Sequence, residues 1–118
     1  MTTSTAGQPL IPQPPSTVTA LRQAIAQIAP AAALPAFTCE LDQAADQSRQ
    51  SSDLAPLQRF IAQWVVYVHI QRQPRLAKEL RLWEDMAGTG DATQARRAAS
   101  AIGKILDDAH AELALPPR

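Results

Sequence analysis

Cysteine is nearly absent from this sequence. The 118 residues include one cysteine, Cys39, so the chain cannot close an internal disulfide. Structural disulfides belong to oxidising compartments, and their exclusion favours a protein of the reducing cytoplasm. The segment from Met1 to Gln8 has neither a basic start nor an apolar core, so we expect no secretory signal there. No apolar run approaches the ~18 residues that a spanning helix needs, so we expect no membrane association.

The sequence also lacks an excess of charge of either sign. Lysine and arginine total 11, aspartate and glutamate total 11, and the formal net charge is zero. Nonspecific nucleic-acid binding depends on neutralising phosphates and favours a basic domain. The balance therefore argues against a nucleic-acid partner, although it leaves room for a local basic patch.

Catalytic and metal-binding patterns are missing as well. The four glycines form no phosphate-binding loop, and no serine stands in a nucleophile elbow. His69 has no second histidine four residues away, the spacing of a helical metal site. His110 lies near Asp107, and such a group could hold a divalent ion weakly, but a solvated acidic helix end is the favoured interpretation. We predict no catalytic residue, no metal site and no cofactor.

One thiol and one pair of carboxylates are further candidates for catalytic chemistry. Cys39 falls in the first turns of a predicted helix, where the helix dipole favours a thiolate, but no histidine is close in sequence and Glu40 adjoins it. Asp42 and Asp46 share a helix face, yet paired carboxylates do acid–base chemistry only in a buried cleft. We interpret the cysteine as structural and the carboxylates as solvated.

Aromatic residues make up only 4% of the chain, whereas alanine is abundant. A core with few rings and many alanines suits closely packed helices better than strands. The apolar residues recur at helical spacing, most clearly from Leu57 to Val68 and from Leu76 to Trp83. The β-branched run Val65–Val68 alone would indicate a strand, but the register of its neighbours favours a helix.

We predict an all-α fold, a compact bundle of about five helices. The helices are expected from Ser16 or Thr17 to about Ile28, from Pro35 to about Gln50, from Asp53 to about Gln71, from Pro74 to about Ala87, and from Asp91 to a stop at Pro116-Pro117. Asp91 and Gln94 have the spacing of a capping box. Residues 1–16 are rich in proline and predict a flexible, disordered tail before a helical domain of residues 17–115.

Basic residues mark the surface that we interpret as partner-binding. The densest run is Arg72, Arg75, Lys78 and Arg81. In the last predicted helix, Arg96 and Arg97 lie near the start, and three carboxylates lie near the end. A helix that is basic at one end and acidic at the other, with a narrow apolar stripe, suits antiparallel pairing with a copy of itself or with a partner. Packing of the stripe inside its own domain is the alternative.

One segment is similar to a known family. "SDLAPLQRFIAQWVVYVHIQRQPRLAKELRLWE", residues 52–84, with "AALPAFTCELDQAADQSRQ" before it, resembles a family of short, uncharacterised helical proteins from actinobacteria. The shared pattern is Asp53 to Leu57, a helix with the central Trp64, and a proline-led helix from Pro74 to Leu82. The motifs are structural and carry over no catalytic residue. The resemblance implies an antitoxin-like role, because such genes often neighbour toxin-like ribonuclease genes.

The leading functional hypothesis is a cytoplasmic, bacterial, non-enzymatic protein that binds another macromolecule, through a protein partner or self-association. A DNA-binding repressor, with a helix-turn-helix around Gln71–Pro74, is the second hypothesis; the zero net charge and the missing turn glycine disfavour it. A small enzyme that uses His110 with Asp107, or Cys39, is the third.

Overall fold

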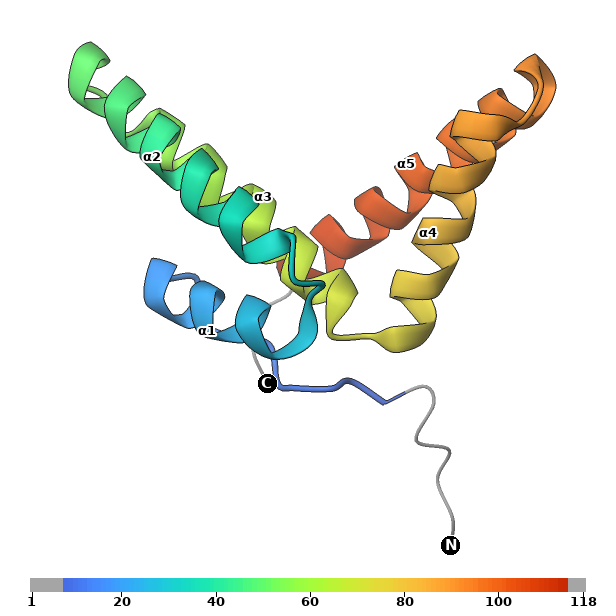
Figure 1. Cartoon of the computed structure of the whole chain (residues 1–118), viewed down its shortest axis with the longest axis horizontal. Helices are drawn as coiled ribbons and strands as arrows, with labels where there is room; N and C mark the ends of the chain where they lie inside the picture. The colour runs from blue at the N-terminus through green and yellow to red at the C-terminus, as the bar shows by residue number, and fades with distance from the viewer. Residues whose placement is uncertain (1–7, 115–118) are drawn as a thin grey trace, which may run out of the picture. The chain divides into compact units, whose positions relative to one another are not determined.

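The computed structural model describes residues 8–114, and these form an all-α fold, as the sequence predicts. The five helices are α1 (Val18–Ile28), α2 (Ala33–Ser51), α3 (Ala55–Gln71), α4 (Pro74–Thr89) and α5 (Ala92–Ala114) (Figure 1). The described residues contain no strand, and the β-branched run Val65–Val68 lies inside α3. Helical register therefore outweighs local β propensity there. The predicted stop at Pro116-Pro117 lies outside the described residues.

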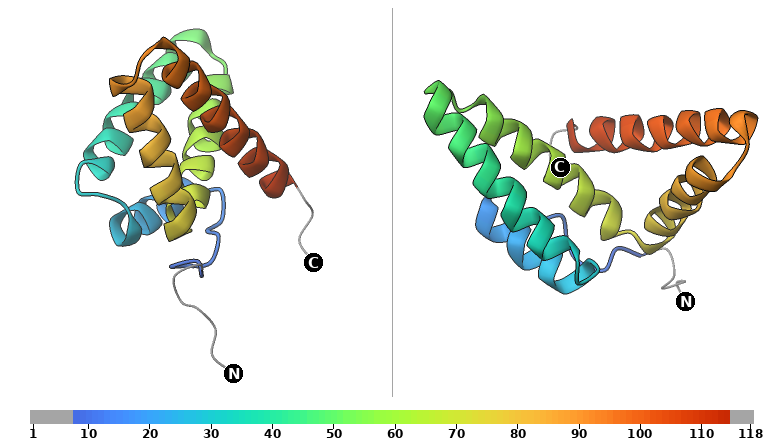
Figure 2. Two further views of the ribbon diagram at one scale, coloured as in Figure 1. Left: turned by 90° about the vertical axis from the view of Figure 1, so that its right-hand side faces the viewer. Right: turned by 45° about the horizontal axis from the view of Figure 1, so that its top comes forward.

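Contacts divide the helices into two compact units. Residues 10–72, with α1, α2 and α3, form one unit, and α4 and α5 belong to the other. In the first unit, α2 and α3 run antiparallel along each other, and α1 packs against both. In the second unit, α4 and α5 form a helical hairpin that opens away from its turn (Figures 1 and 2). Each unit thus has its own interior to fill.

The core of the α1–α3 unit is built around aromatic rings. Phe37 of α2 lies 5.0 Å from the Phe60 ring and 5.2 Å from the Trp64 ring, measured between centroids. Tyr67 meets the Trp64 ring edge-on at 4.9 Å. The indole Nε1 of Trp64 donates a hydrogen bond to Glu40 Oε1 at 3.3 Å. Large rings with one satisfied polar atom stabilise such a small core strongly.

Aliphatic side chains from all three helices complete this core. They follow the helical spacing seen in the sequence, and the buried members of the cluster besides the rings are Leu21, Ala24, Ile25, Ala44 and Val68. In α2, Phe37 and Ala44 are buried, whereas Leu41 and Ala45 are only half-buried. The predicted first helix is confirmed, with Thr17 as its N-cap: Thr17 Oγ1 accepts the Ala20 N–H at 3.2 Å.

The start of two helices differs slightly from the prediction. α2 begins at Ala33, so Pro35 sits inside its first turn, where the missing N–H of proline is harmless. Leu54 is the N-cap of α3, one residue after the predicted Asp53. Asp53 nevertheless supports the start of α3, because its Oδ1 accepts the Ala55 N–H at 3.0 Å.

The turn between α4 and α5 is set by a reciprocal cap. Asp91 Oδ1 accepts the Gln94 N–H at 2.8 Å, and Gln94 Oε1 accepts the Asp91 N–H at 3.0 Å. This is the predicted capping box, with aspartate in place of the usual serine or threonine. Gly90 comes directly before it, and a Cβ built at Gly90 would lie 2.7 Å from both Met86 O and Gln94 Oε1. Only glycine fits this close approach.

Two glycine substitutions are expected to change stability in opposite directions. Gly103 lies in the interior of α5, and a Cβ there meets nothing within 4 Å. Gly103→Ala should stabilise the protein by about 0.5–1 kcal/mol, because glycine is a poor helix former. Gly90→Ala should destabilise it by about 1–3 kcal/mol, because the new methyl group displaces the Gln94 cap. Urea denaturation of both variants tests the pair, and shifts of the same sign would contradict this account of the turn.

Candidate interaction surface

The α4–α5 hairpin covers its apolar side chains incompletely. Its buried residues are Ala77, Ala98, Ile105 and Ala109, so three of the four are alanines. The larger side chains Leu80, Trp83 and Met86 of α4 are only half-buried. Leu82 is 60% exposed and Leu106 of α5 is 36% exposed. The hairpin therefore keeps most of its large apolar side chains in contact with solvent.

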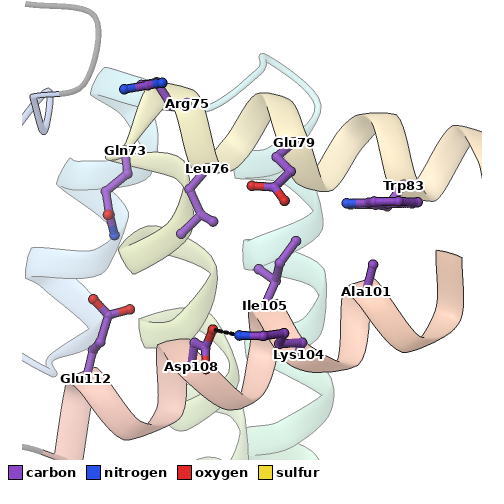
Figure 3. A pocket seen from close by; sticks show the side chains of 10 residues that line it. All are labelled: Gln73, Arg75, Leu76, Glu79, Trp83, Ala101, Lys104, Ile105, Asp108 and Glu112. Atoms are coloured by element: carbon purple, nitrogen blue, oxygen red, sulfur yellow. Dashed lines mark hydrogen bonds and ion pairs between the residues drawn. The ribbon is translucent and has the colours of Figure 1, made fainter. Parts of the chain in front are cut away.

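A groove of about 710 Å³ runs between the two helices. Apolar side chains from both helices line it: Leu76 and Trp83 from α4, and Ala101 and Ile105 from α5. Leu76 points from α4 towards α5, and Ile105 points from α5 towards α4 (Figure 3). A concave apolar surface that includes a half-buried tryptophan suits a protein side chain or helix.

Charged and polar groups flank the apolar part of this groove. Glu79 and Arg75 border it on α4, and Lys104, Asp108 and Glu112 border it on α5. Lys104 Nζ lies 3.0 Å from Asp108 Oδ2, and both side chains are largely exposed. Such an exposed ion pair adds at most about 1 kcal/mol of stability, because solvent screens it. In this pair the Asp108 carboxylate neutralises Lys104, the one lysine of the groove. The Glu112 carboxylate then leaves the α5 side of the groove with an excess of negative charge.

The structure disperses the predicted basic partner-binding residues. Arg75, Lys78 and Arg81 are exposed on α4, and Arg96 and Arg97 are exposed on α5. Of these five, only Arg75 lines the groove. Steps of three residues rotate around a helix, so Arg75, Lys78 and Arg81 do not form one narrow stripe.

Arg72 has a different environment, because it lies in the α1–α3 unit and is half-buried. Its Nε donates to Gln13 Oε1 at 3.0 Å, and its Nη1 donates to the Ile11 carbonyl at 3.2 Å. The Arg72 carbonyl accepts the Leu10 N–H at 2.6 Å. We call residues 10–13 the N-terminal strap. Arg72 thus anchors a segment of its own chain.

The N-terminal strap falls within the predicted flexible tail. Residues 1–7 of that tail lie outside the described residues. In the strap, Ile11 packs against the core, and Gln13 Oε1 also accepts from Nδ1 of His69 at 3.2 Å. His69 is 5% exposed, so it is a buried structural residue rather than an open ligand. Sequence reasoning missed the strap because more than fifty residues separate its partners.

The remaining candidates for chemistry do not line the groove. Cys39 is exposed, and its closest polar contact is Gln43 Nε2 at 3.8 Å from the sulfur. His110 is exposed, and its Nδ1 donates to the Leu106 carbonyl at 2.8 Å. Asp46 forms an exposed ion pair with Arg49 instead of a buried pair with Asp42. Within residues 8–114, no three metal-binding side chains come together.

Comparisons with known proteins assign no family to this chain, so its class is that of its fold, an all-α protein. No family model, curated protein or solved structure matches the chain. The resemblance to short actinobacterial helical proteins therefore stays a prediction. Among the described helices, none combines the length and the apolar character needed to cross a membrane.

The groove itself was not foreseen from the sequence. The apolar register of Leu76, Leu80 and Trp83 predicts that they share one helix face, but the spacing does not show what covers that face. The sequence of α5 does contain a sign of the groove, because about half of its apolar stripe consists of alanine. The small alanine side chains of α5 bury less of the large side chains of α4 than large partners would. The difference in size between the two apolar stripes therefore indicates that part of the α4 stripe stays exposed.

Proposed function

We propose that this chain is a non-enzymatic helical protein that acts by binding another protein in the groove of the α4–α5 hairpin. The observation that supports this function is the half-buried Trp83 beside Leu76, Ala101 and Ile105 in an open groove of about 710 Å³. Tryptophan is among the residue types that most often dominate the binding energy between proteins.

The charges around the groove favour a protein over a nucleic acid. Three carboxylates border it, against two basic side chains, and the Lys104 ammonium is paired with Asp108. The carboxylates are Glu79, Asp108 and Glu112, and the basic residues are Arg75 and Lys104. Phosphates would be repelled by these carboxylates, whereas a helix with basic residues beside its apolar face would be attracted. The zero net charge of the chain agrees with this preference.

The proposed biological role is that of the antitoxin-like or regulatory half of a bacterial, cytoplasmic pair. It rests on the resemblance of residues 52–84 to the actinobacterial family. The α4 part of the groove lies within that segment, since Leu76 and Trp83 belong to it. The partner would then be the toxin-like ribonuclease encoded by the neighbouring gene.

Co-expression of the chain with the product of the adjacent gene tests this function. We expect the two proteins to purify together, and Trp83→Ala to abolish the association by removing the largest apolar side chain that lines the groove. Leu82→Ala is the matched control, because Leu82 is on the same helix, is 60% exposed and does not line the groove. Equal binding by the two variants would show that the groove is not the binding surface.

A second measurement separates protein binding from DNA binding. Binding to DNA should weaken steeply as salt is added, because counterions are released on association. We expect no salt-dependent gel shift with the DNA upstream of the gene. A shift that Arg75→Ala, Lys78→Ala and Arg81→Ala together remove would favour the repressor hypothesis instead.

A further inference from the structure

We propose that the protein seated in the α4–α5 groove, in the absence of another partner, is a second copy of this chain. The two hairpins would pair groove to groove around a two-fold axis and form an antiparallel four-helix bundle. This inference rests on the proposed function, because it names the partner of the same groove. A heterologous partner would then compete with the second copy.

The side-chain sizes in the hairpin support a like partner. Among the groove's apolar side chains, α5 offers the small Ala101 and α4 offers the larger Leu76 and Trp83. Ala98 and Ala109 are already buried. Two helices alone cannot enclose a core, because each has only one neighbour. In an antiparallel two-fold pair each helix faces its own counterpart, so Ala101 lets the two copies of α5 approach closely, and Leu76 and Trp83 pack between the two copies of α4.

The order of charges along α5 selects the orientation of the second copy. Arg97 precedes Lys104 by seven residues and Asp108 by eleven, spacings that return to the same helix face. This face is therefore basic towards the start of α5 and acidic towards its end. A parallel two-fold pair would place α5 opposite α4 of the second copy and would not bring Arg97 and Asp108 together. An antiparallel copy centred between Ile102 and Gly103 places Arg97 opposite Asp108 twice.

The size of the interface is sufficient for a reversible dimer. α4 has 16 residues and is the shorter helix. It is about 24 Å long, and two helices packed side by side present a face about 20 Å wide. Each copy would therefore cover roughly 500 Å² in projection, near the lower limit for specific interfaces. We expect dissociation in the micromolar range, so that another partner can displace the second copy.

Sedimentation equilibrium of the full chain, with a charge exchange, tests the proposal. We expect a monomer–dimer equilibrium that Arg97→Glu and Asp108→Arg each weaken about tenfold, because each places like charges opposite each other at two symmetric positions. The double variant Arg97→Glu/Asp108→Arg should restore the wild-type dissociation constant to within about threefold. Arg96→Glu is the control, because it makes the same charge change one residue away on a different face of α5 and should leave the dimer unchanged.

The outcomes separate this inference from the proposed function. A wild-type chain that stays monomeric at high concentration overturns the second copy, while loss of the neighbouring gene's product in Trp83→Ala would still uphold the groove as a protein-binding site. A dimer that the double variant fails to restore overturns the antiparallel groove pairing. A dimer that Arg96→Glu weakens as much as Arg97→Glu does overturns it as well. Circular dichroism of each variant verifies that the helices remain intact.

Discussion

Replacing Trp64 by alanine is expected to abolish cooperative thermal unfolding of the α1–α3 unit. The side chain is 6% exposed and contacts the rings of Phe37, Phe60 and Tyr67. Removing a buried indole costs about 3–5 kcal/mol, which is the lost transfer free energy plus the cavity left behind. Small domains have only about 5–15 kcal/mol of stability in total, and a unit of residues 10–72 belongs at the lower end. Thermal circular dichroism is the measurement.

Two matched variants show which property of Trp64 matters. Trp64→Phe keeps a ring in the core but loses the hydrogen bond to Glu40 Oε1, and it should cost only about 1–2 kcal/mol. Trp83→Ala removes the other tryptophan, which is half-buried, and should only weaken the melting transition. An unchanged midpoint for Trp64→Ala would refute the proposed aromatic core.

Arg72→Ala is expected to release the N-terminal strap and to destabilise the protein by about 1.5–3 kcal/mol. The guanidinium donates to Gln13 Oε1 and to the Ile11 carbonyl, and hydrogen bonds to a charged donor are stronger than neutral ones. The Leu10 amide, which donates to the Arg72 carbonyl, should be protected from hydrogen exchange in the wild type. In the variant its protection should fall to that of an open segment.

The strap prediction has a control on the neighbouring helix and a coupling test. Arg75→Ala removes the same kind of side chain from an exposed site and should leave Leu10 protected. Gln13→Ala and Arg72→Ala should be strongly non-additive, with a coupling energy of about 1 kcal/mol or more, because both remove the same interaction. Additive losses would mean that the two side chains do not act together, and the strap would then need another explanation.

Local patterns in the sequence were sufficient to predict the helices. Their positions follow from apolar spacing together with end signals that act within a few residues, as at Thr17 and at the Asp91–Gln94 capping box. The run Val65–Val68 has a β propensity, but the helical register of the neighbouring large side chains predicts a helix. Burial of one helix face outweighs the β propensity of four residues. The predicted start of α2 at Pro35 is two residues late, because proline is tolerated at several positions in a first turn.

Contacts between distant residues could not be predicted in the same way. The bond from Trp64 to Glu40 and the strap on Arg72 depend on how helices are oriented in space, and spacing within one segment holds no information about that. The groove of the hairpin is a similar case. The stripe on each helix was visible, but the space left between Trp83 and Ala101 depends on how far the two helices diverge.

The contacts of this chain join residues that are separated by very different lengths of sequence, and this difference implies an order in which the parts of the structure form. The α4–α5 turn closes over a few residues between Met86 and Gln94, so the chain entropy lost in forming it is small. The bonds between Gln13 and Arg72 enclose the whole of α1, α2 and α3, so they form only after those helices have been placed. During synthesis on the ribosome, residues 10–13 would emerge early and wait for Arg72, so the strap would be the last part of the α1–α3 unit to settle.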